Sequence, residues 1–577
     1  MKKIKHAPLF SLVSLLALTG CGGTNNSENG GKGQYIDVDP LQIENFNEQY
    51  LPVKDKILRK QGNINLCLQF DGTEDAWQAL ANEYQRLHGN SVRVNLKTYT
   101  GNYSDYIVNQ MNTLDIVHGN LLTNIENYCT NMYQYIYKEN PYAGKDDDGN
   151  VNYWSDVLNE EAYVSSQSAS NATYILNSEN LQTAWFINKD ALNEAAKQGY
   201  NKKDSNGNVA NPETWDELID CLEGMYKAGY KHPLGISLND ESIDGFQFTW
   251  LLRVYGDYYY RNEYKNIVIN DNYQYDPQDK APESDGDWSY KETVFYNSIL
   301  DNRSGSERPY IQGTSKKTDY VGALSNKYKE FLSQLEKMKK YIASDASDTN
   351  YSLNNARGYF AYQTRGKENS PQVFLDYAGE GLLFAKSDKI NYDFFDYPKM
   401  VSAGGYIDDN SIIRDVGGNG GYLSIVRNGK SDNQVNLSLD FLKFVMSPYG
   451  QTIYYDALSK TSYAPKGLTT VINDYVVVPE AWESFFKTDK IQFNGLVDEN
   501  PYVQNFLRNL GNMSESKTAL RTLMRGLLSD TGSDKKTIEQ VQQGWNDALF
   551  SSWDSYCLKV GWNKNSYKNP GSDVTGN

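Results

Sequence analysis

The alternation of short apolar strands with amphipathic helices near the start of this sequence is the feature that most restricts its fold. Residues 63–70 (NINLCLQF) have the β-branched and apolar character of a strand, and residues 74–87 place apolar side chains at helical spacing. A strand at 91–96, a helix at 103–111 and a strand at 114–117 follow. This β-α-β-α-β order predicts an α/β fold with a mainly parallel sheet and helices on both of its faces.

Length and composition restrict the class of protein further. A chain of 577 residues is long enough for roughly two to four folding units. Its formal charge of −17 excludes a protein that grips nucleic acid through phosphates, because such a protein needs a basic footprint. The 46 Tyr and 10 Trp residues indicate many rings near the surface, whereas the 4 His residues argue against a dense metal site. We therefore expect no nucleic-acid partner, no metal and no cofactor.

The N-terminal residues have the pattern of an export signal. Lys2, Lys3 and Lys5 form a positive start before the apolar run at residues 9–18. This run would rise only about 15 Å as a helix, which is about half of a bilayer core. It therefore predicts a signal peptide and not a membrane span.

The signal ends in Leu18-Thr19-Gly20-Cys21, which resembles a bacterial lipoprotein box. The resemblance implies removal of residues 1–20 and attachment of lipid, including palmitate, at Cys21. An ordinary secretory peptide with a chance cysteine is the alternative. Residues 21–60 are expected to be the lipidated cysteine and a flexible tether, because their first part is rich in Gly, Asn and Ser. We expect an exported protein that lipid anchors to the extracytoplasmic face of the cell membrane.

The other four cysteines give no framework of their own. Cys67, Cys129, Cys221 and Cys557 are far apart and contain no C-x-x-C pair. Buried thiols that act as small hydrophobes are one interpretation, and a disulfide among them is the other. Neither interpretation gives a nucleophile.

A second series of strands and helices follows further along the chain. Residues 181–187 (LQTAWFI) predict a strand that leads into a helix. Thr214 is a natural N-cap, and Glu217 three residues later completes a capping box. The helix that they begin runs to Lys227 and leads into a strand at 233–237.

Seven features in this order resemble a known family. They are the lipoprotein start, the strand and helix around Trp77, the strand ending Asp115-Ile116-Val117, the strand into Asn188-Lys189-Asp190, the run from Pro212 to Leu218 with the strand at Pro233, the segments Gly379 to Phe384 and Gly417 to Ile425, and the helix from Leu439 to Gly450 with its Ser-Pro-x-Gly end. Together they are similar to the extracellular solute-binding proteins of the maltose-binding type (family 1), the substrate-binding components of carbohydrate ABC transporters. The resemblance covers roughly residues 60–470.

The resemblance implies a periplasmic-binding-protein-like fold of type II, with two α/β lobes and a ligand cleft between them. Lobe one would comprise residues 61–185 and 398–460, and lobe two would comprise residues 188–396 and 465–577. Crossings between the lobes would lie near Trp185-Phe186, near Phe394 to Tyr397 and near Lys460 to Tyr463. A chain of this length also has room for insertions, which we place near 130–175, 255–320 and 470–500.

The implied ligand is a carbohydrate, most naturally an oligosaccharide, and the site residues follow from its chemistry. Sugar hydroxyls need directed donors and acceptors, and sugar C–H faces stack on aromatic rings. Ligands of open α/β sheets bind outside the carboxyl ends of strands, and Gly-rich backbone allows close approach. The candidate ligand-binding residues are therefore Asp71, Asn120, Trp185, Trp250, Arg253, Tyr255, Gly418 and Asn419. For each ring the competing interpretation is ordinary core packing, and for the glycine run it is a surface turn.

Other functions stay open at this point. An oligopeptide-binding lipoprotein suits the length, and a surface glycan-capturing lipoprotein suits the wealth of aromatic residues. An exported glycosidase would need two carboxylates that flank a glycosidic bond, and no hydrolase motif appears in the sequence. We expect a monomeric binding protein, not an enzyme, whose partners are a carbohydrate and the permease subunits of an ABC importer.

Overall fold

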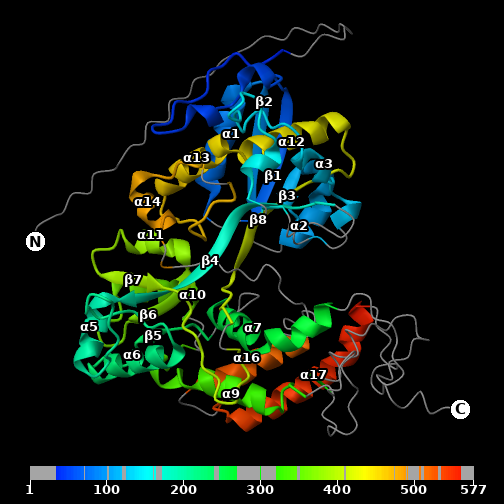
Figure 1. Ribbon diagram of the computed structural model, residues 1–577. Coiled ribbons are helices and arrows are strands. Elements are labelled where there is room, and N and C mark those ends of the chain that lie inside the picture. The colour runs from blue at the N-terminus through cyan, green and yellow to red at the C-terminus, as the bar shows by residue number, and fades with distance from the viewer. Residues whose placement is uncertain are drawn as a thin grey trace, which may run out of the picture.

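The structure is a computed structural model of the chain. It describes residues 34–69, 72–99, 103–119, 122, 125–159, 162–163, 172–238, 246–269, 299–300, 320–346, 351–408, 411–472, 475–488, 490, 506–507, 513–529 and 534–560. The chain forms an upper and a lower lobe, which long strands join (Figure 1). The predicted signal peptide, Cys21 and the first part of the predicted tether lie outside the described residues.

Strands and helices alternate through both lobes. The strands are β1 (Gly62–Gln69), β2 (Val92–Tyr99), β3 (Ile116–His118), β4 (Leu176–Asn188), β5 (Leu234–Gly235), β6 (Val373–Tyr377), β7 (Tyr392–Phe395) and β8 (Gly417–Ile425). The α-helices are α1 (Glu74–Leu87), α2 (Tyr103–Gln110), α3 (Tyr133–Ile136), α4 (Trp154–Val157), α5 (Lys189–Lys197), α6 (Trp215–Lys227), α7 (Phe246–Ile269), α9 (Asn326–Glu336), α10 (Leu353–Tyr362), α11 (Gly381–Phe384), α12 (Asp432–Val445), α13 (Pro448–Ser459), α14 (Glu480–Phe486), α16 (Ser514–Leu528) and α17 (Ile538–Val560). Short 3-10 helices are η1 (Glu48–Tyr50), η2 (Lys54–Lys56), η3 (Met111–Thr113), η5 (Ile125–Asn127), η9 (Lys339–Tyr341) and η10 (Ala378–Glu380).

Lobe one is built on β2, β1, β3 and β8, in that order, with the first half of β4 at the edge. The β1–β2 and β1–β3 pairs are parallel, as the β-α-β-α-β pattern predicts. The β3–β8 and β4–β8 pairs are antiparallel, because β8 and β4 are the strands that run between the lobes. Helices α1 and α12 pack on this sheet, and α13 packs on both of these helices.

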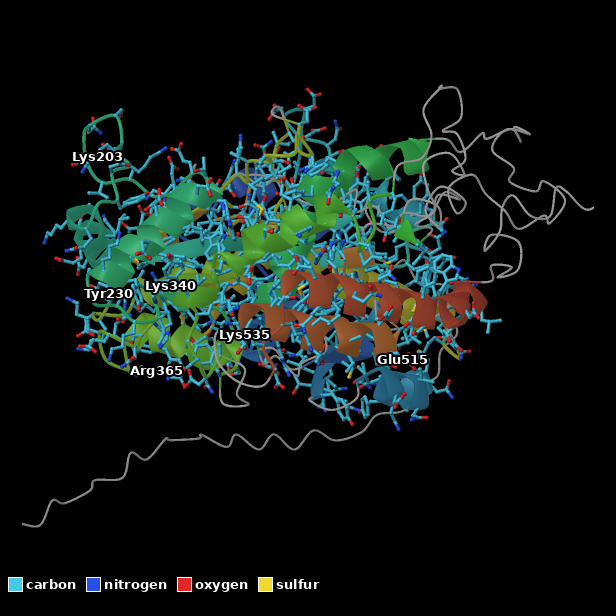
Figure 2. The ribbon with its side chains drawn as sticks, turned by 90° about the horizontal axis from the view of Figure 1, so that it is seen from below. Lys203, Tyr230, Lys340, Arg365, Glu515 and Lys535 are labelled. Carbon is cyan, nitrogen blue, oxygen red and sulfur yellow. The ribbon has the colours of Figure 1, made fainter. Side chains whose placement is uncertain are left out.

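Lobe two is built on β7, the second half of β4, β6 and β5. The β5–β6 pair is parallel and the pairs that involve β4 are antiparallel. Helices α5, α6 and α10 pack near the sheet, and α7, α9, α16 and α17 form a helical layer beside it, at the lower right of Figure 1. Seen from below, this layer lies beside the part of lobe two that Lys340 and Tyr230 mark, with Glu515 at the start of α16 (Figure 2). The structure is thus the predicted two-lobed α/β fold, with mixed rather than mainly parallel sheets.

Strand β4 belongs to both lobes. Its first half, Leu176–Gln182, pairs with β8, and its second half, from Thr183, pairs with β6 and β7. The apolar second half corresponds to the strand predicted at 181–187. The first half is polar in sequence yet buried, which is why its pattern did not indicate a strand.

The other crossings differ from the sequence-based boundaries. The described residues between 398 and 416 stay on lobe two, where Lys399 forms a bridge with Thr214 and Ser402 donates a hydrogen bond to Glu330 at 2.6 Å. The chain therefore enters lobe one at β8 and not at residue 398. The segment after residue 465 contacts both lobes: Ile472 forms a bridge with Leu158 in lobe one, and the ring of Phe485 stacks on that of Phe394 in lobe two.

Residues 34–60 pack on lobe one as an N-terminal arm. Ile36 and Ile57 are buried, and the ring of Tyr50 stacks on that of Tyr475 with centroids 4.1 Å apart. The predicted flexible tether of residues 21–60 is therefore a packed segment in its described part. The sequence of this segment is mostly polar, so the few apolar residues that pack it on lobe one did not indicate an ordered structure.

Two further elements differ from the sequence analysis. The expected strand at 379–384 is helical (η10 and α11), and the Ser-Pro-x-Gly run begins α13, where the side chain of Ser447 accepts a hydrogen bond as N-cap, rather than ending a helix. Cys67, Cys129 and Cys221 are buried, and the side chain of Cys557 lies outside the described part. Among the described residues no helix is both long and apolar enough to cross a membrane.

Candidate functional site

At the junction of the lobes, polar side chains of β4, the first crossing, bind the segment that follows α13, residues 460–470, which is the third crossing. Glu179 accepts a hydrogen bond from the backbone N–H of Lys466 at 3.1 Å, and Gln182 accepts one from the N–H of Leu468 at 2.8 Å. The amide of Asn180 donates to the same crossing. These buried side chains add to the backbone hydrogen bond from the N–H of Gln182 to the carbonyl of Lys466, which also joins the two segments. They are the reason for the polar sequence of this half of β4.

Glu179 also positions a cationic side chain. The ammonium of Lys466 lies 3.7 Å from its carboxylate, and the side chain of Lys466 is 32 % exposed. Tyr422 of β8 lies in the electrostatic field of this pair. Burial raises the pKa of Tyr422, while the charges of Lys466 and Arg253 lower it and that of Glu179 raises it. A carboxylate, two cations and a phenol from four different segments thus meet at the junction.

Trp250 and Arg253 enter the same region from α7. The Trp250 ring is 4 % exposed and meets the ring of Tyr377 edge-on, with centroids 5.0 Å apart. Burial raises the pKa of Tyr377 to about 12, and the charge of Lys466 is the largest influence that lowers it. Two of the predicted site residues, Trp250 and Arg253, are therefore brought together with Tyr377, Tyr422 and Lys466.

Tyr255 and Trp185, two other predicted site residues, are packed in the core. Tyr255 is fully buried, donates its hydroxyl hydrogen bond to the backbone carbonyl of Pro398 at 2.9 Å, and meets Trp215 edge-on. Trp185 is also fully buried and stacks on Phe395. In this arrangement neither ring is open to a ligand, so the competing packing interpretation describes both.

The remaining predicted positions lie at the edges of the junction. Gly418 and Asn419 belong to β8, where their backbones pair with Leu181 and Asn180 of β4, and the side chain of Asn419 lies outside the described part. Asp71 and Asn120 are themselves outside the described residues. Glu179, Tyr377, Tyr422 and Lys466 were not predicted as site residues, and only Glu179 lies in a run of polar residues beside an apolar strand that could have indicated it.

Tyr463 is a further aromatic residue that the analysis did not select. Its ring packs so closely on Gly72, which follows β1, that a Cβ on this glycine would lie 2.1 Å from a ring carbon. Gly72 has a φ of +90°, a conformation that favours glycine. Tyr463 is 43 % exposed, so a ring from the third crossing is available to solvent at the carboxyl end of β1.

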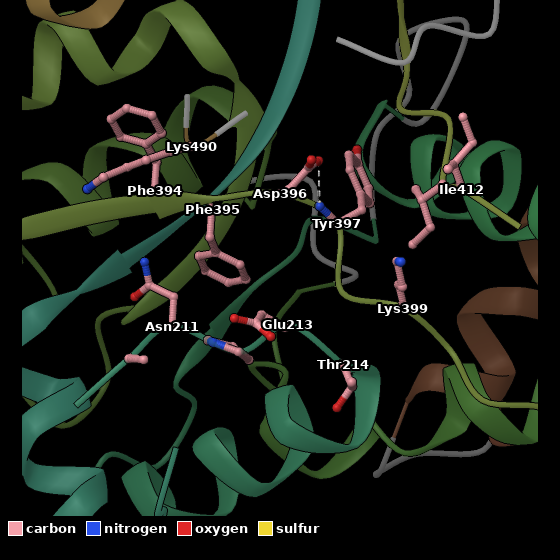
Figure 3. Close-up of a pocket in the computed structure, with 13 residues that line it drawn as sticks. Asn211, Glu213, Thr214, Phe394, Phe395, Asp396, Tyr397, Lys399, Ile412 and Lys490 are labelled. Atoms are coloured by element: carbon pink, nitrogen blue, oxygen red, sulfur yellow. Dashed lines mark hydrogen bonds between the residues drawn. The ribbon is translucent and has the colours of Figure 1, made fainter. Parts of the chain in front are cut away.

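A separate cavity of about 580 Å³ lies within lobe two. Its wall is formed by the loop before α6, by the end of β7 and by Ile412, and Lys490 closes one side (Figure 3). Phe394 and Phe395 give it an apolar floor, and Lys490 forms an ion pair with Asp393 beside it. Among the described residues no group of His, Cys, Asp and Glu side chains is placed to hold a metal ion.

Comparison with known proteins addresses the fold. No protein-family profile matches this sequence, and no curated protein sequence matches it. Among solved structures, a "probable secreted solute-binding lipoprotein" from Streptomyces coelicolor superposes with a TM-score of 0.51 at 11 % identity, over 85 % of this chain and 99 % of that one. The fold is that of a two-lobed solute-binding protein.

Other structures of this fold resemble the chain less closely. A binding protein from Bacillus subtilis in an open conformation matches with a TM-score of 0.49 at 13 % identity, over 85 % of this chain and 98 % of that one. A family 1 extracellular solute-binding protein from Bifidobacterium longum subsp. infantis matches with a TM-score of 0.47 at 12 % identity, over 85 % of this chain and 99 % of that one. Many such neighbours are family 1 extracellular solute-binding proteins of sugar ABC transporters.

Proposed function

We propose that this two-lobed protein captures a carbohydrate at the junction of its lobes and delivers it to an ABC-type importer. The observation that carries the proposal is the set of side chains at the junction: the half-buried rings of Tyr377 and Tyr422 lie in the field of the cationic side chain of Lys466, with Arg253 also acting on Tyr422, and the buried ring of Trp250 supports Tyr377 from behind. Rings offer faces for sugar C–H groups, and fixed charges offer donors for hydroxyl groups.

The mechanism follows from the way in which the lobes are connected. A ligand that contacts both lobes stabilises the arrangement in which both sets of contacts exist, and so shifts the population toward it. We expect the change in conformation to be concentrated in the crossings, because β4 pairs with β8 in lobe one and with β6 and β7 in lobe two. The importer would then distinguish the liganded shape from the free one.

We also propose that the protein acts outside the cytoplasm as a lipoprotein. The signal pattern of residues 1–20 and the cysteine at position 21 support this localisation. The permease subunits of the importer are the proposed protein partners, and the proposed working form is a monomer. The role is binding and not catalysis.

The test is a ligand screen by thermal shift on the chain without its first 21 residues. Mono-, di- and oligosaccharides are compared with short peptides, because a ligand that binds only the folded state raises the melting temperature by mass action. A rise with one class of glycan, with the glycan recovered intact, is the expected result. A rise with peptides alone would refute the carbohydrate assignment, and the release of cleaved sugar would refute the non-catalytic one.

Variants at the junction make the test residue-specific. Arg253→Met removes a guanidinium but keeps most of the side-chain volume, and should weaken binding of the glycan at least about tenfold, the loss expected for one hydrogen bond to a charged group. Arg427→Met on the exposed surface of lobe one is the matched control and should leave the affinity unchanged. Equal affinities of the two variants in calorimetric titration would remove Arg253 from the site.

A further inference from the structure

Two buried carboxyl groups share one arginine at the end of β6. Asp376 is fully buried and is held by Arg357 through two hydrogen bonds, of 2.6 Å from Nε and 2.9 Å from Nη2. The same Nη2 lies 3.2 Å from Oε1 of Glu380, whose side chain is only 12 % exposed. The second oxygen of Glu380, Oε2, is buried and has no hydrogen-bond partner among the described residues. We call these three residues the Arg357 cluster.

The charges of the cluster do not balance when both carboxyl groups are ionised. One guanidinium then faces two carboxylates in a region with little water, and Asp376 has the better geometry for the pairing. Burial raises the pKa of Glu380 to about 8, with Asp376 adding to the rise and Arg357 opposing it. Tyr377 of β6 lies next to Asp376 in the chain. The charges of Lys466 of the third crossing and of Glu179 of β4 also act on Tyr377, so both side chains lie in the surroundings of the cluster.

The cluster is in direct contact with the hinge. Gly379, the residue before Glu380, packs against the backbone carbonyl of Pro465 so closely that a Cβ would lie 1.7 Å from its oxygen. Pro465 precedes Lys466, which β4 holds through Glu179. The short helical segment η10 is therefore confined between α10 on one side and the third crossing on the other.

We propose that the Arg357 cluster is a proton-sensitive clamp on the hinge: a proton on Glu380 keeps η10 packed against the third crossing, and its loss to solvent releases that contact. An ionised Glu380 gains free energy by moving toward water, and it carries Gly379 with it. The clamp would regulate the junction to which we assigned ligand binding. Only the effect of the clamp on ligand affinity rests on the proposed function, because the protonation of Glu380 can be measured without a ligand.

The first test is the pH dependence of unfolding of the unliganded protein. The folded state holds a proton on Glu380 that the unfolded state, with a carboxyl pKa of about 4.3, has lost near neutral pH. Stability from this proton is complete below the unfolded pKa and is lost as pH rises through the folded one. The folding equilibrium constant of the wild type should therefore fall by up to about tenfold per pH unit between about pH 5 and pH 8. The Glu380→Gln variant should not show this fall.

The matched control is Glu368→Gln, because Glu368 is exposed and pairs only with Lys231 at the surface. Its pH profile should run parallel to that of the wild type. Parallel profiles of Glu380→Gln and the wild type would overturn the proposal. A Glu380→Gln variant that is less stable than the wild type throughout this pH range would overturn it as well, because the ionised form would then be the stabilising one.

The second test reads the hinge directly. Spin labels on exposed positions of the two lobes, at Asp432 of α12 and Lys227 of α6, report the distance between the lobes by pulsed electron resonance. Raising the pH from about 6 to about 9, across the range in which Glu380 loses its proton, should broaden the distance distribution of the wild type and leave that of Glu380→Gln unchanged. An unchanged wild-type distance distribution would overturn the clamp, but it would say nothing about sugar binding. Conversely, failure of the glycan screen would refute the proposed carbohydrate ligand and leave the pH response of the clamp unaffected.

Discussion

Replacing Gln182 by leucine tests whether side chains of β4 hold the third crossing in place. Gln182 is 2 % exposed, and its Oε1 accepts the backbone N–H of Leu468 at 2.8 Å. Leucine has a similar volume and no acceptor, so the change leaves a buried N–H without a partner and creates little cavity. An unsatisfied buried donor costs about 1–3 kcal/mol. We expect a loss near 2 kcal/mol in the free energy of unfolding, which is about 30-fold in the folding equilibrium.

Urea titration and amide hydrogen exchange measure this effect at two levels. Urea unfolding gives the change in global stability, and exchange of the peptide that contains Leu468 reports the local one. Gln543→Leu is the matched control, because Gln543 lies on the exposed face of α17 and pairs only with Asp547. A Gln182→Leu variant with a change below about 0.5 kcal/mol, the range of ordinary surface substitutions, and with unaltered exchange would refute the reasoning.

Two more predictions concern the stability of each lobe. Asp440→Asn should destabilise lobe one by about 1–3 kcal/mol, because Asp440 accepts hydrogen bonds from the buried hydroxyls of Tyr84 and Tyr142. Burial works to raise the pKa of Asp440, but hydrogen bonds and positive charges hold that pKa below its usual value. The difference in stability between wild type and variant, measured by urea titration, should therefore shrink as pH falls below about 4. Thr214→Ala removes the cap of α6, in which Thr214 and Glu217 satisfy each other's backbone N–H groups, and should cost about 1 kcal/mol in the same assay; an unchanged midpoint would contradict the cap.

The sequence correctly predicted the elements that are determined by interactions between residues close together in the chain. The helix at 74–87 and the glycine-led strand at 417–425 have the predicted bounds. The capping box at Thr214 begins α6, which ends at Lys227 as predicted. Helical periodicity and capping are properties of a few consecutive residues, so a sequence reveals them without knowledge of the rest of the fold.

Features that depend on distant partners were not predictable. The first half of β4 has the polar sequence of a loop, and its burial follows from its pairing with β8 and from its hydrogen bonds to a segment almost 290 residues later. The segment from Gly379 has the composition of a strand, but the carbonyl of Pro465 packs against it where it turns as η10. The junction residues Tyr422 and Lys466 were missed for the same reason, because nothing in their neighbouring sequence marks them.

The N-terminal arm determines which lobe moves when the protein is attached to a support. Residues 34–60 pack on lobe one, and the arm has its own buried contacts there. Force applied through the chain before residue 34 therefore reaches lobe one first. In a single-molecule or surface-immobilised experiment with that attachment, lobe one is the stationary body and lobe two is the part that swings, so an optical reporter of ligand capture belongs on lobe two.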